Sequence, residues 1–147
     1  MLLRIQHYDF RFEEIAEASR EEAVRTFQRL DWVAELTQAQ EARQRGFQVC
    51  TIGMELMDDT GSRLFLSPID RHTICFNYVY PCFRSEFGLG RLQQEEEKFV
   101  ACYPIDALGR LISLHYRSER SAILQIEAEE SRPGLTWRAD GSGSGRP

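Results

Sequence analysis

The sequence has no long apolar run and almost no lysine. No stretch approaches the roughly 18 consecutive apolar residues that a helix needs to cross a bilayer, so we expect no membrane-spanning segment. The first ten residues lack the basic start and long apolar core of a secretory signal, which predicts a cytoplasmic protein. Lys98 is the only lysine among 18 basic residues, and this arginine bias is typical of GC-rich bacterial genomes.

Basic residues are also fewer than acidic ones. The chain has 23 acidic and 18 basic residues, which gives a formal net charge of −5. Nucleic acids and anionic membranes attract proteins that carry a basic surface. We therefore expect neither as a partner. The acidic balance suits a protein partner such as a basic toxin domain, and it equally suits simple solubility.

The cysteine pattern argues against both a disulfide framework and a metal site. Cys50, Cys75, Cys82 and Cys102 are spread through a chain of 147 residues, which can bury a core without covalent links. We expect four free, buried thiols. His72 and Cys75 lie three residues apart on an expected strand and would point to opposite faces, so we predict no metal ion and no cofactor.

Motifs of the common catalytic mechanisms are missing as well. The sequence contains no G-x-S-x-G nucleophile turn, and the glycines of residues 87–91 lack the lysine of a phosphate-binding loop. Cys50 lies on an expected strand and not at a helix N-terminus, which would activate its thiol. Alternation with Leu114 and Tyr116 predicts that His115 faces solvent. We therefore expect a protein that is not an enzyme.

A helical region is predicted from residue 19 to residue 45. Ser19 and Glu22 have the spacing of a capping box, and the apolar residues that follow recur every three or four positions: Val24, Phe27, Leu30 and Ala34. The apolar stripe shifts near Asp31, which predicts a kink or two successive helices. Gly46 is expected to end the region.

Strand-like alternation begins after Gly46. Residues 50–56, 64–66 and 73–80 read as three strands joined by short turns, the first at Asp58–Ser62, and residues 2–12 as an earlier strand. We predict an irregular segment at 81–97 with a short helix near its end. Further strands are expected at 99–103, 111–116 and 122–128, the last two joined as a hairpin by 117–121. A helix at 106–117 is the alternative.

One segment has a local resemblance. Residues 103–116 resemble the hairpin element of rearrangement-hotspot YD repeats at Tyr103, Asp106, Gly109, Arg110 and Leu111. The match covers one short segment and occurs once. We interpret it as shared turn chemistry and not as membership of the family.

Together these patterns predict an α+β fold: an antiparallel sheet of roughly five to seven strands with the N-terminal helical region packed on one face. In the expected core Val24, Phe27 and Leu30 meet Ile52, Met54 and Phe76. We expect a single domain at 1–138 and a flexible Gly/Ser tail at 139–147.

The expected function is binding, best described as that of a bacterial immunity protein that neutralises a toxin. A secretion chaperone or adaptor is one alternative, and a small-ligand domain or enzyme with a pocket between helix and sheet is another. The predicted contact surface combines acidic residues with aromatic anchors, namely Asp58, Asp59, Tyr78, Tyr80, Phe83, Glu95, Glu96 and Glu97. The alternative interpretations are a solvated face for the glutamate run and core packing for the aromatic residues.

Overall fold

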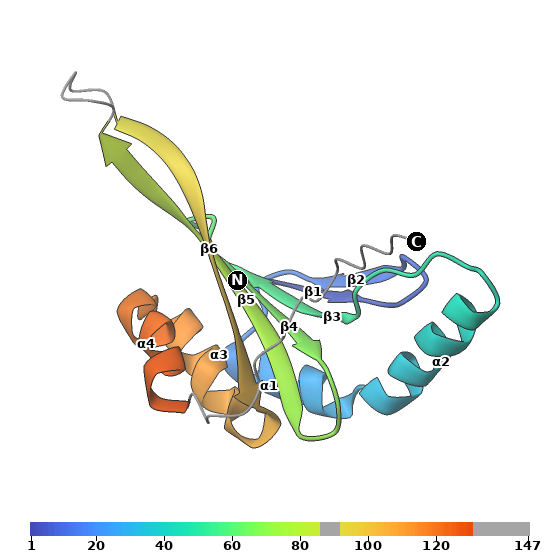
Figure 1. The fold of residues 1–147 in the computed structure, drawn as a ribbon. Helices are drawn as coiled ribbons and strands as arrows, with labels where there is room; N and C mark the ends of the chain where they lie inside the picture. The colour runs from blue at the N-terminus through green and yellow to red at the C-terminus, as the bar shows by residue number, and fades with distance from the viewer. Residues whose placement is uncertain (86–91, 131–147) are drawn as a thin grey trace, which may run out of the picture.

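The protein is described here by a computed structural model that covers residues 1–85 and 92–130 (Figure 1). In chain order its elements are β1 (Leu2–Gln6), β2 (Phe12–Ile15), α1 (Arg20–Arg29), α2 (Trp32–Gln44), β3 (Gly53–Met57), β4 (Arg63–Pro68), β5 (Thr73–Ser85), β6 (Leu92–Pro104), the 3-10 turn η1 (Ile105–Ala107), α3 (Leu108–Tyr116) and α4 (Arg120–Glu130). The tail predicted at 139–147 lies outside the described residues, as does the predicted domain limit at 138.

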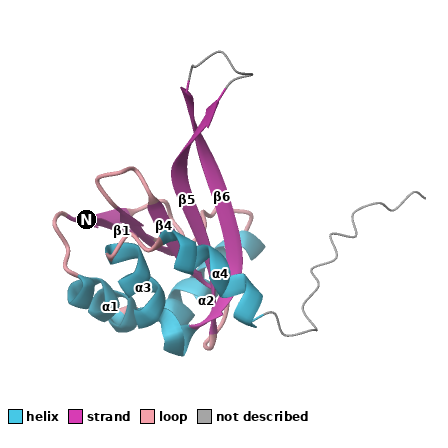
Figure 2. Ribbon diagram, turned by 90° about the vertical axis from the view of Figure 1, so that its left-hand side faces the viewer, coloured by secondary structure: helices cyan, strands magenta, loops and turns pink. Residues whose placement is uncertain are grey.

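One antiparallel sheet contains all six strands, in the order β2-β1-β3-β4-β5-β6. The helices lie on one side of this sheet, with α1, α3 and α4 grouped together and α2 running on from α1 (Figures 1 and 2). The predicted α+β fold, with the N-terminal helices on one face, is confirmed. No helix in the described parts of the chain is long and apolar enough to cross a membrane.

The core lies between the helices and the strand residues that alternate toward them. These strand residues are Leu3, Ile5, Met54, Leu56, Leu64, Leu66, Ile74, Phe76, Tyr78 and Tyr103. From the helices, Phe27 of α1 and four residues of α3 enter the same cluster, namely Leu108, Leu111, Ile112 and Leu114. Of the predicted core residues, Phe27, Ile52, Met54 and Phe76 are buried, whereas Val24 and Leu30 pack against the cluster and are partly buried.

The predicted break in the helical region is confirmed as two helices. Ser19 caps α1 by accepting a hydrogen bond from the backbone N–H of Glu22. Asp31 caps α2 in the same way, accepting from the N–H of Ala34 at 3.0 Å. Gly46 follows the end of α2 with a φ of 83°, a left-handed conformation that glycine adopts without strain.

The prediction for residues 81–97 is wrong, because β5 and β6 remain paired as far as Ser85 and Leu92. β4 pairs with β5 only up to Val79, so the two strands continue beyond it as a ribbon that projects from the sheet (Figure 1). Pro81 fits there because β5 has only one neighbouring strand at that point. The expected short helix in this region is therefore part of β6.

The predicted strands at 111–116 and 122–128, with their hairpin, are also wrong. These segments are α3 and α4, so the alternative helix applies to the first of them. Residues 103–116, which resemble the hairpin element of YD repeats, do not form a hairpin either. His115 is 1% exposed instead of facing solvent, and its Nε2 lies 3.1 Å from the carbonyl oxygen of Leu56.

None of the four cysteines forms a disulfide, as predicted. The prediction that they are buried is wrong. Cys50, Cys75 and Cys82 are half-buried, and Cys102 is exposed.

Truncation of Phe27 tests the packing of α1 on the sheet. Because this ring is buried and packs against Trp32 with centroids 4.8 Å apart, Phe27→Ala should lower the free energy of unfolding by about 3–5 kcal/mol. The exposed Phe12 is the matched control, and Phe12→Ala should cost less than about 1 kcal/mol. Equal costs in urea denaturation would contradict this arrangement of the core.

His115 should make the protein sensitive to mild acid. Burial lowers the pKa of His115 below its usual 6.5. The unfolded chain therefore binds a proton more readily than the folded one, and stability is lost as the pH falls below about 6.5, by at most about 1.4 kcal/mol per pH unit. His115→Gln keeps a donor for Leu56 and should flatten this part of the profile. Identical profiles for the two proteins between pH 7 and about pH 5 would contradict the assignment.

Candidate functional site

The predicted acidic and aromatic surface is not formed as one patch. Asp58 belongs to the β3–β4 turn, where its Oδ1 accepts hydrogen bonds from the backbone N–H groups of Thr60 and Ser62, both at 2.9 Å. Its position is thus explained by turn structure. Asp59, the next residue, is exposed.

The acidic run on β6 is divided between the two faces of the sheet. Glu96 forms an ion pair with Arg63 at 2.8 Å on the open face, by which we mean the sheet face away from the helices. Glu97 points the other way and accepts a hydrogen bond from the Tyr80 hydroxyl at 2.6 Å. Glu95 shares the helix-side face with Glu97, because strand residues two apart lie on the same face. The run therefore does not form a single acidic patch.

Two of the three predicted aromatic anchors are buried. Tyr78 is 2% exposed and Tyr80 is 8% exposed, and their ring centroids lie 5.4 Å apart. The hydrogen bond to Glu97, together with burial, raises the pKa of Tyr80. The guanidinium of Arg120 lies 4.5 Å from the centre of its ring. The side chain of Phe83 lies outside the described residues.

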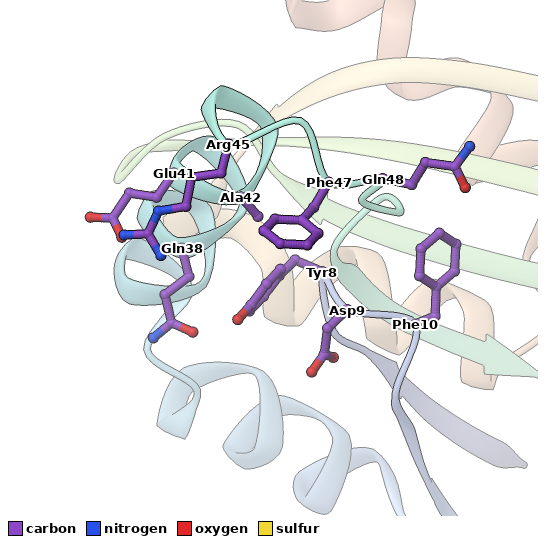
Figure 3. A pocket seen from close by; sticks show the side chains of 9 residues that line it. All are labelled: Tyr8, Asp9, Phe10, Gln38, Glu41, Ala42, Arg45, Phe47 and Gln48. Atoms are coloured by element: carbon purple, nitrogen blue, oxygen red, sulfur yellow. The ribbon is translucent and has the colours of Figure 1, made fainter.

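Two exposed phenylalanines lie instead in the loop between β1 and β2 and in the segment after α2. A groove of about 360 Å³ opens there between this loop, the last turns of α2 and the segment after it (Figure 3). Its lining residues are Tyr8, Asp9, Phe10, Gln38, Glu41, Ala42, Arg45, Phe47 and Gln48. Phe10 and Phe47 are 56% and 66% exposed. We call this site the aromatic groove.

The loop holds Phe10 in an unusual backbone conformation. The N–H of His7 donates to the carbonyl of Arg11 at 2.9 Å, and the N–H of Phe10 donates to the carbonyl of His7 at 3.3 Å. Such a short hairpin loop ends in a left-handed residue, a position that favours glycine or asparagine. Phe10 has a φ of 66°, which is strained for a bulky side chain. Strain of this kind is concentrated at functional sites.

Several contacts fix the loop to the elements around it. The Nδ1 of His7 lies 2.8 Å from a carboxylate oxygen of Glu35 in α2, and its Nε2 lies 3.3 Å from Glu13 in β2. Cys50 donates its backbone N–H to the carbonyl of Tyr8 at 3.0 Å and its thiol to the carbonyl of His7 at 2.8 Å. The groove is therefore a supported surface and not a loose loop tip.

Charged groups form the rim of the groove. Arg11 donates to Asp9 at 2.6 Å, and this hydrogen bond holds the pKa of Asp9 below its usual value. Arg45 and Glu41 approach to 3.9 Å one helical turn apart. Aromatic side chains surrounded by paired charges match the composition of protein interfaces, with an apolar centre and a polar rim.

Two histidines are held in structural contacts. Both ring nitrogens of His7 face carboxylate oxygens, those of Glu35 and Glu13, so the imidazole is held between α2 and β2. His115 is enclosed in the core. Among the described residues, no three histidine, cysteine or acidic side chains are placed to share a metal ion.

Comparison with known proteins adds no family to this description. No family model, curated protein or solved structure matches the chain.

Sequence reasoning missed Phe10 and Phe47. Two local sequence features mark these positions. Phe47 directly follows the glycine that ends α2, and Phe10 stands in a short polar loop where a small residue is usual. Neither signal indicates that the two rings line one groove, because that depends on how α2 is placed beside β1.

Relief of the strain at Phe10 provides a test. Asparagine tolerates the left-handed region, so Phe10→Asn should raise the free energy of unfolding by up to about 1 kcal/mol. Phe10→Ala also removes the ring but keeps the strain, and it should be less stable than Phe10→Asn in urea denaturation. A loss of more than about 1 kcal/mol in Phe10→Asn would instead show that the ring packs as part of the structure.

Proposed function

We propose that this protein acts by binding another protein and that the aromatic groove is part of the contact surface. The observation that carries the proposal is the convergence of two exposed phenylalanines, one of them strained, on one hollow. Burying such rings would contribute most of the binding energy at an interface, since aromatic side chains dominate interaction hot spots. The strain at Phe10 then has a purpose, because it presents the ring outward before the partner arrives.

The more specific form of the proposal is an inhibitor of a bacterial toxin. A net charge of −5 complements a basic toxin domain and would speed its association with this protein. A chaperone or adaptor of a secretion apparatus is the alternative within the same class. The two forms share the groove and differ in the partner, so co-expression with the products of neighbouring genes separates them.

A small-ligand site is the second candidate function. The groove volume of about 360 Å³ lies at the lower end of the range for ligand pockets, about 300–1,000 Å³. Gln38 and Gln48 provide polar groups in the lining. Against this stands the high exposure of Phe10 and Phe47, since pockets for small molecules enclose most of the ligand surface.

Substitution of both exposed rings tests the proposal. The double variant Phe10→Asn/Phe47→Ser should fold normally and bind its partner at least about 10-fold more weakly, the loss expected when one hot-spot side chain is removed. The partner is first captured by cross-linking to immobilised wild-type protein in a lysate of the source organism. It is then purified, and its affinity for each variant is measured by calorimetry.

Phe12→Ser is the matched control. Phe12 is 62% exposed, as open to solvent as the groove rings, but it does not line the groove. This control should bind like the wild type. If the double variant binds with wild-type affinity, or if both variants lose affinity equally, the groove is not the contact surface. If a purified metabolite is retained in place of a protein, the small-ligand function replaces the one proposed.

A further inference from the structure

Two cysteines lie directly opposite each other on neighbouring strands. Cys75 of β5 and Cys102 of β6 are register partners in the antiparallel ladder, and both are reduced. They lie on the open face, because the residues that precede and follow Cys75, Ile74 and Phe76, point into the core. Cys75 is half-buried and Cys102 is exposed, so one sulfur of the pair is open to reagents in solution.

The spacing of such a pair suits a disulfide. Residues directly opposite in an antiparallel pair have Cα atoms about 4.5–5.5 Å apart, within the range of about 4.4–6.8 Å found in disulfides. The Cβ atoms must approach slightly, from about 4.5–5.5 Å to about 3.5–4.5 Å. On its other side Cys75 faces Ser67 of β4, a small side chain that leaves room for this adjustment.

The two other cysteines are not placed to compete. Cys82 lies seven residues farther along β5 and on the helix-side face, opposite Glu95. Cys50 lies before β3, where its thiol donates to the carbonyl of His7. The chain therefore carries one pair of thiols that can close and two thiols that cannot reach it.

We propose that Cys75 and Cys102 form a reversible thiol–disulfide site that reacts with low-molecular-weight disulfides. This inference is independent of the aromatic groove and of the proposed function. The exposed Cys102 reacts first. Its thiolate attacks one sulfur of the small disulfide, an S–S bond forms to Cys102, and the other half leaves as a thiol after taking up a proton.

Cys75 then completes the exchange. Its thiolate attacks the Cys102 sulfur, the cross-strand S–S bond forms, and the second half of the small disulfide leaves as a thiol. In total the two cysteines lose two electrons and two protons, and the small disulfide gains them as two thiols. Burial, reinforced by the nearby Cys102, raises the pKa of Cys75, so this second step should accelerate as the pH rises.

A Cys75–Cys102 disulfide would fix the end of β6, where the chain leaves the sheet. Cys102 stands just before Pro104, the last residue of β6, after which η1 and α3 begin. A bond from Cys102 to Cys75 therefore ties the start of the C-terminal helices to β5, the strand next to this edge of the sheet. Because it closes a long chain loop, it should raise the denaturation midpoint.

The experiment uses a full-length variant that keeps only this pair, Cys50→Ser/Cys82→Ala. It is incubated with oxidised glutathione, and then thiols are blocked with iodoacetamide and the mass is recorded. We expect a monomer that has lost two hydrogen atoms and takes up no iodoacetamide, with a raised urea midpoint. Dithiothreitol should reverse both changes. Single Cys75→Ser in this background should stop at a glutathione adduct on Cys102.

The matched control is Cys75→Ser/Cys102→Ser, which retains Cys50 and Cys82 and should form no intramolecular disulfide. Three outcomes would overturn the proposal: unreacted thiols in the two-cysteine variant, a glutathione adduct that never closes although Cys75 is present, or a disulfide-linked dimer. Peptide mapping of the oxidised wild-type protein gives the same answer if a variant fails to fold, since a peptide pair other than 75–102 would contradict the site.

Discussion

Burial of one sheet face beneath the helices is the constraint on which the rest of the structure depends. Leu3, Met54 and Leu64 illustrate it, each fully buried on its own strand. Because side chains alternate with a period of two, the residues between them are forced onto the open face whatever their chemistry. Charged residues there form cross-strand pairs, as Arg4 does with Glu14 at 2.8 Å and Glu55 at 3.2 Å.

The parts of the fold that the sequence predicts depend on local signals. The caps at Ser19 and Asp31 and the turn at Asp58 are short-range hydrogen-bond patterns, legible without knowledge of the fold. The segment 91–98 is different. Its glutamates and glutamines favour a helix locally, but residues 92–98 pair with residues 79–85 of β5, and such long-range pairing is not visible in the segment itself. The apolar residues of 111–116 fit both the helical and the strand period. Only the pattern of burial in the folded protein distinguishes a helix from a strand there.

The aromatic groove could not be predicted because it is assembled from separate segments. Tyr8 and Phe10 come from the β1–β2 loop, Glu41 and Arg45 from the end of α2 or just after it, and Phe47 from the connection to β3. No motif spans them. Clustering of aromatic residues in the sequence predicts anchors such as Tyr78, but in this strand the clustered rings pack into the core. Exposure of an aromatic ring is a tertiary property.

The acidic run acquires a structural explanation from its place on an edge strand. β6 ends the strand order, so its outer edge has no strand beside it within the described residues. A long unpaired edge can recruit a strand from another molecule, and charged side chains oppose this. Glu95, Glu96, Glu97 and Lys98 occupy the middle of β6. The aromatic groove lies by the β1–β2 loop, at the opposite edge of the sheet. In the proposed function, protection from aggregation and recognition of a partner are therefore separate tasks at opposite edges of one sheet.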